Sequence, residues 1–135
     1  MGMSWRAETL CDGEAVGEVL RLDAPISFWG GIDPQTARVT LAGHPQFGTS
    51  IAEKILVVRE LIGSSSSSAV LLELIYQGRT PSALILGARD AILPVGVLVA
   101  EQMDWGTVPV LQLPDAPFET GQRLRIAKGG TISEA

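Results

Sequence analysis

"LIGSSSSSAVLLELIYQG", Leu61 to Gly78, places five consecutive serines between two strongly apolar stretches. The apolar residues before the serines belong to a predicted buried strand, and those after them belong to a predicted buried helix. A serine run in this position is a flexible linker, a set of helix caps, or part of a ligand site. Each interpretation divides the chain differently, so this stretch decides the fold.

Length and composition favour one folded domain. The chain has 135 residues, of which 46% are hydrophobic and 19% are charged, a balance that suits a packed core and not a disordered chain. We expect a single domain with its core at about residues 14–127 and short flexible ends. A linker at the serines would leave a strand and a helix without their packing partners, which disfavours that interpretation.

The hydrophobic pattern predicts an α/β fold. Short apolar runs indicate strands at residues 14–22, 54–58, 82–87, 108–113 and 122–128. Helices are predicted after the serines, with Gly78 as the stop signal, and from Pro94 in "PVGVLVAEQM". A strand, helix, strand order occurs twice, which indicates a partly parallel sheet with two covering helices, preceded by a β-rich segment.

Charge and hydropathy exclude several partners. Ten basic and fifteen acidic residues give a formal net charge of −5, without the basic cluster that tracks a phosphate backbone. We therefore expect no nucleic-acid partner. Acidic residues interrupt the N-terminal stretch where a signal peptide is apolar, and no apolar run reaches the roughly 18–20 residues of a membrane span. We expect a cytoplasmic protein with no membrane association.

Cys11 and His44 are the single cysteine and the single histidine of the chain. Together they are too few for a zinc or iron–sulfur site, so we expect no cofactor bound by this chain alone, and any metal must come from another chain. His44 lies in a loop bounded by glycine and proline, where it is either a turn residue or a catalytic group, such as a general acid or a phosphoryl carrier. Cys11 is interpreted as a free thiol without a special role.

The serines occupy a favourable place for a ligand. They are predicted between the carboxyl end of a strand and the N-terminus of a helix, where open α/β sheets bind their ligands. Unpaired N–H groups and the helix dipole attract carboxylates or phosphates there, and serine hydroxyls can cap the helix or contact the ligand. The sequence favours an anion or substrate site, with simple helix capping as the alternative.

"SFWGGIDP", residues 27–34, is a second candidate lining segment. Glycines allow the backbone to approach a ligand closely, so we expect Gly31 and Asp33 to contact the substrate, beside Phe28 and Trp29. The alternative is a structural turn beneath a core aromatic pair. If the site is closed by another chain, the free subunit should expose an apolar patch around Phe28 and Trp29 and self-associate.

Four ordered blocks resemble the aconitase X family, in its small subunit or swivel domain. The blocks are "LRLDAPISFWGGIDPQTARV", "GHPQFGTSIAEKILVV", "GSSSSSAVLLELI" and "DAILPVGVLVAEQM", which lie between about Gly17 and Leu113. The resemblance implies a swivelling β/β/α domain like the fourth domain of aconitase, with a mixed β-sheet or barrel and two main helices. It also implies a large-subunit partner that holds an iron–sulfur cluster.

The resemblance further implies a reaction. The known hydro-lyases of the family dehydrate cis-3-hydroxy-L-proline or mevalonate 5-phosphate. A serine directly after a glycine acts as base on the carbon next to a carboxylate, while the iron centre draws off the hydroxyl. In this chain that serine is Ser64, although the register leaves any serine of 64–68 open. Gly63, Ser65 and Ser66 would bind the small carboxylate substrate.

The serine block also suggests the substrate branch. Its unbroken serines resemble bacterial members, which favours dehydration of cis-3-hydroxy-L-proline to Δ1-pyrroline-2-carboxylate. Relatives often have a Gly-Arg-Gly or Gly-Lys-Gly lead into the serines, whereas "RELIGSS" has its nearest basic residue at Arg59. The alternatives are dehydration of mevalonate 5-phosphate, a phosphoryl carrier that uses His44, and a non-catalytic module whose serines bind a small anion.

Overall fold

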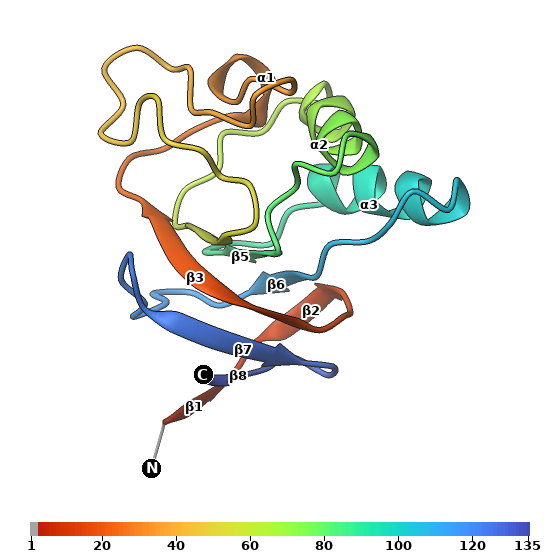
Figure 1. Ribbon diagram of the computed structural model, residues 1–135. Coiled ribbons are helices and arrows are strands. Elements are labelled where there is room, and N and C mark those ends of the chain that lie inside the picture. Colours follow the sequence, from red (N-terminus) through yellow and green to blue (C-terminus); the bar gives the residue numbers. More distant parts are fainter. Residues whose placement is uncertain (1–2) are drawn as a thin grey trace.

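The structure is a computed structural model in which residues 3–135 are described. It is a mixed α/β fold, which confirms the predicted class (Figure 1). Its elements in chain order are β1 (Ser4–Arg6), β2 (Glu8–Cys11), β3 (Ala15–Leu22), α1 (Phe28–Gly31), β4 (Ile55–Val58), α2 (Ser67–Tyr76), β5 (Ala83–Leu86), α3 (Ile92–Gln102), β6 (Val110–Gln112), β7 (Arg123–Ala127) and β8 (Thr131–Glu134).

All of these strands belong to one mixed sheet that closes on itself. The strand order is β1-β8-β7-β3-β4-β5-β6-β2. Strands β3 to β6 run parallel to one another, while the remaining pairings are antiparallel. The first and last strands of this order, β1 and β2, are separated in the chain only by Ala7, whose N–H donates to the Gly130 carbonyl at 2.8 Å. The sheet therefore forms a barrel.

Two hydrophobic cores lie on opposite faces of the parallel strands. In β4, Leu56 and Val58 pack beneath the helices, whereas Ile55 and Val57 fill the barrel. Residues of β5 alternate in the same way. Because both faces are buried, these strands consist of continuous apolar runs instead of alternating ones. The helices cover one side of the sheet, and β7, β8 and β1 lie on the side away from them (Figure 1).

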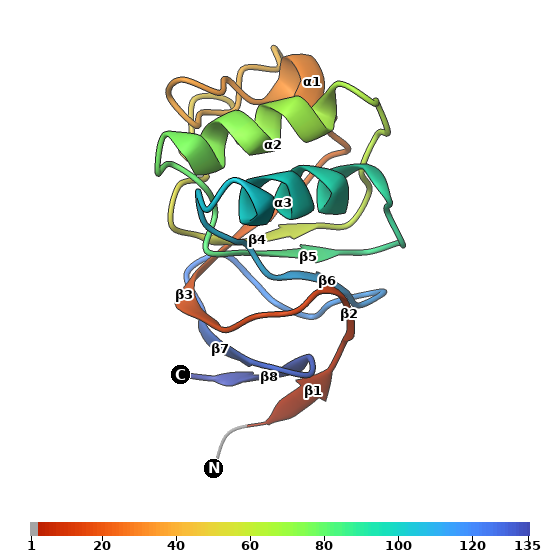
Figure 2. The same ribbon diagram turned by 90° about the vertical axis from the view of Figure 1, so that its right-hand side faces the viewer.

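The two longer helices lie side by side over the sheet (Figure 2). Helix α2 ends at a Schellman motif, because Gly78 has a φ of +71°, its N–H donates to Ile75, and the Arg79 N–H donates to Leu74. Helix α3 begins two residues before Pro94, where the sequence predicted its start. The Asp90 carboxylate accepts the Leu93 N–H at 2.8 Å and so stabilises the extra residues.

The structure extends the predicted architecture at both ends of the chain. Strands β1, β2 and β8 lie outside the predicted core of residues 14–127, and their pairing completes the barrel. The predicted two main helices are confirmed as α2 and α3, and the short α1 is additional. Among residues 3–135, no helix is both long and apolar enough to cross a membrane.

Candidate functional site

The serine loop, defined here as residues 63–66, connects β4 to α2 at the carboxyl edge of the parallel strands. Gly63 also lies against the start of α3, because a Cβ placed on it would be 3.7 Å from Cδ1 of Ile92. The strand before the serines and the helix after them pack within one domain. The linker interpretation is therefore wrong, and the loop occupies the edge where α/β sheets bind ligands.

The five serines have different environments. Ser67 is 2% exposed and its Oγ accepts the Trp29 N–H at 3.1 Å. The Ser68 hydroxyl donates to the Ser65 carbonyl at 3.0 Å. Ser64 and Ser66 are half-buried, and Ser65 is exposed. The hydroxyls of Ser67 and Ser68 are thus engaged in structural bonds, which leaves the first three serines for chemistry.

Those three serines present unpaired donors. The Ser64 carbonyl accepts the Ser67 N–H at 2.9 Å, and the Ser66 carbonyl accepts from Ala69 and Val70. No hydrogen bond within residues 3–135 uses the N–H groups or hydroxyls of Ser64, Ser65 and Ser66. Ser66 is the N-cap of α2, yet its side chain makes no cap bond. The loop can therefore bind a carboxylate through N–H and hydroxyl donors beside the helix dipole.

The chain segment that contains this loop has no cationic side chain. The sequence has no lysine or arginine between Arg59 and Arg79. Arg59 lines a separate cavity of about 210 Å³ together with Asp23 and Glu60, and none of the serines lines it. Hydrogen bonds from Arg21 and Gln46 lower the pKa of Asp23, and the charge of Arg59 adds to this effect. The N-terminal dipole of α2 supplies positive potential at the serine loop.

The segment "SFWGGIDP" turns beside the first turn of α2. Phe28 is fully buried, whereas the side chain of Trp29 is 61% exposed. The prediction that Phe28 and Trp29 together form an exposed apolar patch is therefore wrong for Phe28, which points into the core. Successive side chains in a helical turn project about 100° apart, so Phe28 can face the core while its neighbour Trp29 faces outward.

The two predicted contact residues of this segment differ in position. Gly31 is buried, and a Cβ placed on it would lie 2.6 Å from Cγ1 of Ile26, so close packing requires a glycine there. Asp33 accepts the Gln35 N–H at 2.8 Å in a local turn. It also lines an open groove of about 460 Å³, whose walls are Trp29, Gly30, Ile32, Asp33, Pro34, Thr40 and Val70. Val70 places this groove along the first turn of α2.

His44 is a buried turn residue. Its Nε2 donates to the Ala24 carbonyl at 3.1 Å, and its Nδ1 accepts the Gln46 N–H at 3.0 Å. Both ring nitrogens are occupied by backbone groups, which disfavours the phosphoryl-carrier interpretation.

The residues of this chain do not fit an iron–sulfur cluster. Burial, assisted by the charge of Glu101, raises the pKa of the Cys11 thiol to about 11, which opposes the thiolate form that binds metals. Within residues 3–135, no group of three or more histidine, cysteine, aspartate or glutamate side chains could hold a metal ion. No catalytic step of this chain is therefore assigned to a cluster.

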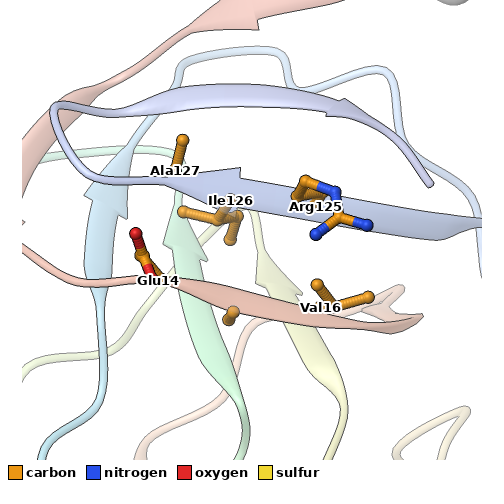
Figure 3. A pocket seen from close by; sticks show the side chains of 6 residues that line it. Glu14, Val16, Arg125, Ile126 and Ala127 are labelled. Atoms are coloured by element: carbon orange, nitrogen blue, oxygen red, sulfur yellow. The ribbon is translucent and has the colours of Figure 1, made fainter.

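Another pocket, with a volume of about 260 Å³, lies between β3 and β7 (Figure 3). Its lining includes Glu14 and Arg125, together with Ala15, Val16, Ile126 and Ala127. It lies near the start of β3, while the serine loop follows the carboxyl ends of the parallel strands. It contains one carboxylate and one guanidinium but no hydroxyl or thiol nucleophile, so the serine loop has the richer chemistry.

A closed mixed sheet, two covering helices and a serine loop at the carboxyl edge define a swivel domain of the β/β/α type. A sequence model of the aconitase X swivel domain matches residues 4–134. The chain belongs to this family, as its sequence blocks predicted.

Individual relatives show the same relationship. A cis-3-hydroxy-L-proline dehydratase of Hypocrea jecorina is 41% identical over 90% of this chain, which spans 21% of that protein. A phosphomevalonate dehydratase small subunit of Thermococcus gammatolerans is 37% identical, with 92% of this chain and 91% of that protein aligned. The crystal structure of Thermococcus kodakaraensis aconitase X in its holo-form superposes with a TM-score of 0.88 at 31% identity, covering 99% of both chains.

Proposed function

We propose that this chain is the small subunit of an aconitase X-type dehydratase, and that it supplies the serine base of a site completed by a large subunit. The observation that carries the proposal is the unpaired serine loop at the N-terminus of α2. Family membership and the dehydratase names of two relatives support it. A dehydratase is a hydro-lyase, so the reaction removes water from the substrate.

Ser64 is the proposed base. Its alkoxide accepts the proton from the carbon next to the substrate carboxylate, hydroxide leaves the neighbouring carbon, and a double bond forms between the two carbons. A serine alkoxide requires strong stabilisation, because a free hydroxyl is a weak base. The neighbouring N–H groups and the N-terminal dipole of the ten-residue helix α2 supply part of it. The acceptor for the hydroxide belongs to the partner.

Substrate binding is assigned to the residues around the base. Ser65 and Ser66 donate N–H and hydroxyl hydrogen bonds to the substrate carboxylate. Gly63 has no side chain, so the backbone can approach the ligand closely. Asp33 lies on the neighbouring groove and Gly31 packs behind it, so these two residues shape the site from its second segment.

The proposed substrate is cis-3-hydroxy-L-proline, which would give an enamine that tautomerises to Δ1-pyrroline-2-carboxylate. Its single carboxylate matches a loop that offers hydroxyls and N–H groups. A phosphate ester would meet no lysine or arginine between residues 60 and 78, although phosphate sites commonly include such side chains.

Mevalonate 5-phosphate is the second candidate substrate. One specific observation favours it: the Thermococcus gammatolerans small subunit aligns with 92% of this chain and 91% of its own length at 37% identity. The alignment with the Hypocrea jecorina dehydratase covers 21% of that protein.

The proposal assigns the iron–sulfur cluster to the large subunit, because residues 3–135 offer no suitable ligand set. The chain alone should be inactive. The test is co-expression with the aconitase X-type large subunit of the same genome under anaerobic conditions, followed by assays of both candidate substrates.

Dehydration of cis-3-hydroxy-L-proline by the wild-type complex, and its loss in an assembled Ser64→Ala complex, would support the proposal. If the complex carries its cluster and dehydrates only mevalonate 5-phosphate, that compound would replace cis-3-hydroxy-L-proline as the proposed substrate. Dehydration by a Ser64→Ala complex at the wild-type rate would remove Ser64 as the base.

A further inference from the structure

Ser67 is the buried member of the serine run, and its hydroxyl joins two segments that are far apart in the chain. Its Oγ accepts the Trp29 N–H at 3.1 Å and lies 3.3 Å from the Ser27 hydroxyl, with which it shares a hydrogen bond. An alanine would fill nearly the same volume in the first turn of α2. The hydroxyl is therefore explained by these two contacts and not by packing.

The contact with Trp29 acts as a helix cap supplied by another element. The first N–H groups of a helix have no partner within it, and the N-cap side chain usually accepts one of them. Ser27 is the N-cap of α1, yet its side chain makes no cap bond. Ser67 accepts the Trp29 N–H in its place. α1 has only four residues, and Trp29 and Gly30 within it have non-helical dihedral angles, so its own hydrogen bonds give it little stability and the bond to Ser67 helps to hold this turn.

Trp29 is an unusual residue to hold in this way. Its indole is 61% exposed, and it forms a wall of the groove that continues to Val70, one turn along α2. Because it is so exposed, little packing fixes its orientation. Trp29 shares the groove lining with Ile32, Pro34 and Val70, and apolar side chains that are contiguous in this way mark a binding surface.

We propose that Ser67 is a positioning residue that fixes Trp29 as an apolar wall of the substrate chamber, beside the serine loop. The inference rests on the proposed function, since it assumes that substrate binds at Ser64 to Ser66. Ser67 holds both the first turn of α2 and the Trp29 backbone, so it sets the distance between the base and this wall. The matching ligand is a small hydroxy acid with apolar ring carbons that pack on the indole.

The first test measures the link itself, without turnover. In the full-length subunit, alone and in the complex, Ser67→Ala should raise the exchange rate of the Trp29 amide by about tenfold or more, because the N–H loses its acceptor. Amides inside α2, such as those of Leu74 and Ile75, should keep their exchange rates. Ser50→Ala is the matched control, because Ser50 Oγ also accepts a backbone N–H, that of Ala52 at 3.2 Å, in a separate loop.

The second test measures the consequence in the assembled complex. Ser67→Ala and Trp29→Ala should each raise KM by about tenfold with little change in kcat, because a wall contacts the ground state and the transition state alike. The double variant should resemble either single variant, because Ser67 acts through Trp29. Ser50→Ala should keep the wild-type KM.

The outcomes separate this inference from the proposed function. Unchanged exchange of the Trp29 amide in Ser67→Ala, or additive effects in the double variant, would overturn the inference while the wild-type complex still dehydrates its substrate. A cluster-loaded wild-type complex that dehydrates neither substrate would overturn the proposed function and the substrate-wall role together, even if Ser67→Ala releases the amide.

Discussion

Gly96 of α3 packs directly against the carbonyl of Ser68 in the first turn of α2, so that a Cβ on Gly96 would lie 2.6 Å from that oxygen. The two helices therefore meet backbone to backbone beside the serine loop. The Ser68 hydroxyl also donates a hydrogen bond to the Ser65 carbonyl. A side chain at Gly96 that displaces Ser68 would therefore also displace Ser65, one of the proposed substrate-binding residues.

Gly96→Ala should therefore destabilise the protein, against the usual trend for helices. Replacing an exposed helical glycine by alanine stabilises by roughly 1 kcal/mol, but a methyl group forced against a carbonyl costs about 1–3 kcal/mol. We expect a net loss of unfolding free energy in urea titrations and a lower kcat/KM in the complex. Val99→Ala, on the exposed face of α3, is the control with a small effect. A more stable Gly96→Ala protein would contradict the packing described here.

Substitutions in the serine loop should separate the base from the substrate-binding residues. Ser64→Ala should lower kcat by about 10²–10⁴-fold, the usual contribution of a general base. Ser65→Ala should mainly raise KM, because its hydrogen bonds to the carboxylate are present before proton transfer. Steady-state kinetics of complexes matched for assembly and cluster content would measure both. If kcat falls far more in Ser65→Ala or Ser66→Ala than in Ser64→Ala, the base lies one or two residues later.

His44 should contribute to stability and not to chemistry. His44→Ala removes the hydrogen bonds to the partly buried backbone groups of Ala24 and Gln46, which costs about 0.5–1.5 kcal/mol each. Thermal unfolding should show a lower Tm, while the surviving folded complex should keep its kcat. A labile phosphate on His44, detected by mass spectrometry under alkaline conditions, would restore the phosphoryl-carrier interpretation.

Local sequence signals located the parallel strands, both longer helices and the serine loop, because each depends on apolar runs and on stop residues such as Gly78. The pairing of β1 with β8 and of β2 with β6 was missed, because such pairing joins opposite ends of the chain and short polar strands carry a weak local signal. The separation of Phe28 from Trp29 was also missed, because adjacent side chains in a turn project in different directions and the local sequence does not show which of them meets the core.

Within the site, the sequence identified the serine run but could not distinguish its members. Five identical residues carry no compositional difference, and only the tertiary contact with Trp29 assigns Ser67 to the core. Gly31 and Asp33 were likewise predicted together, being two positions apart in the chain, but the groove lining includes only Asp33.

Cys11 should make stability fall at alkaline pH. Burial, with a smaller contribution from Glu101, raises the pKa of its thiol from 9.0 to about 11. The folded protein thus holds the proton more tightly than the unfolded chain. The stabilisation is fully present below pH 9 and is lost as the pH rises through 11, by on the order of 2 kcal/mol for this shift.

Cys11→Ala lacks the thiol, so the difference between the pH profiles of the two proteins isolates its ionisation from that of lysines and tyrosine. Urea unfolding at pH 8 and pH 10.5 should show a steeper decline for the wild type, and a thiol reagent at pH 8 should modify Cys11 slowly until urea is added. Parallel profiles and rapid modification of the folded protein would show that the thiol is not buried.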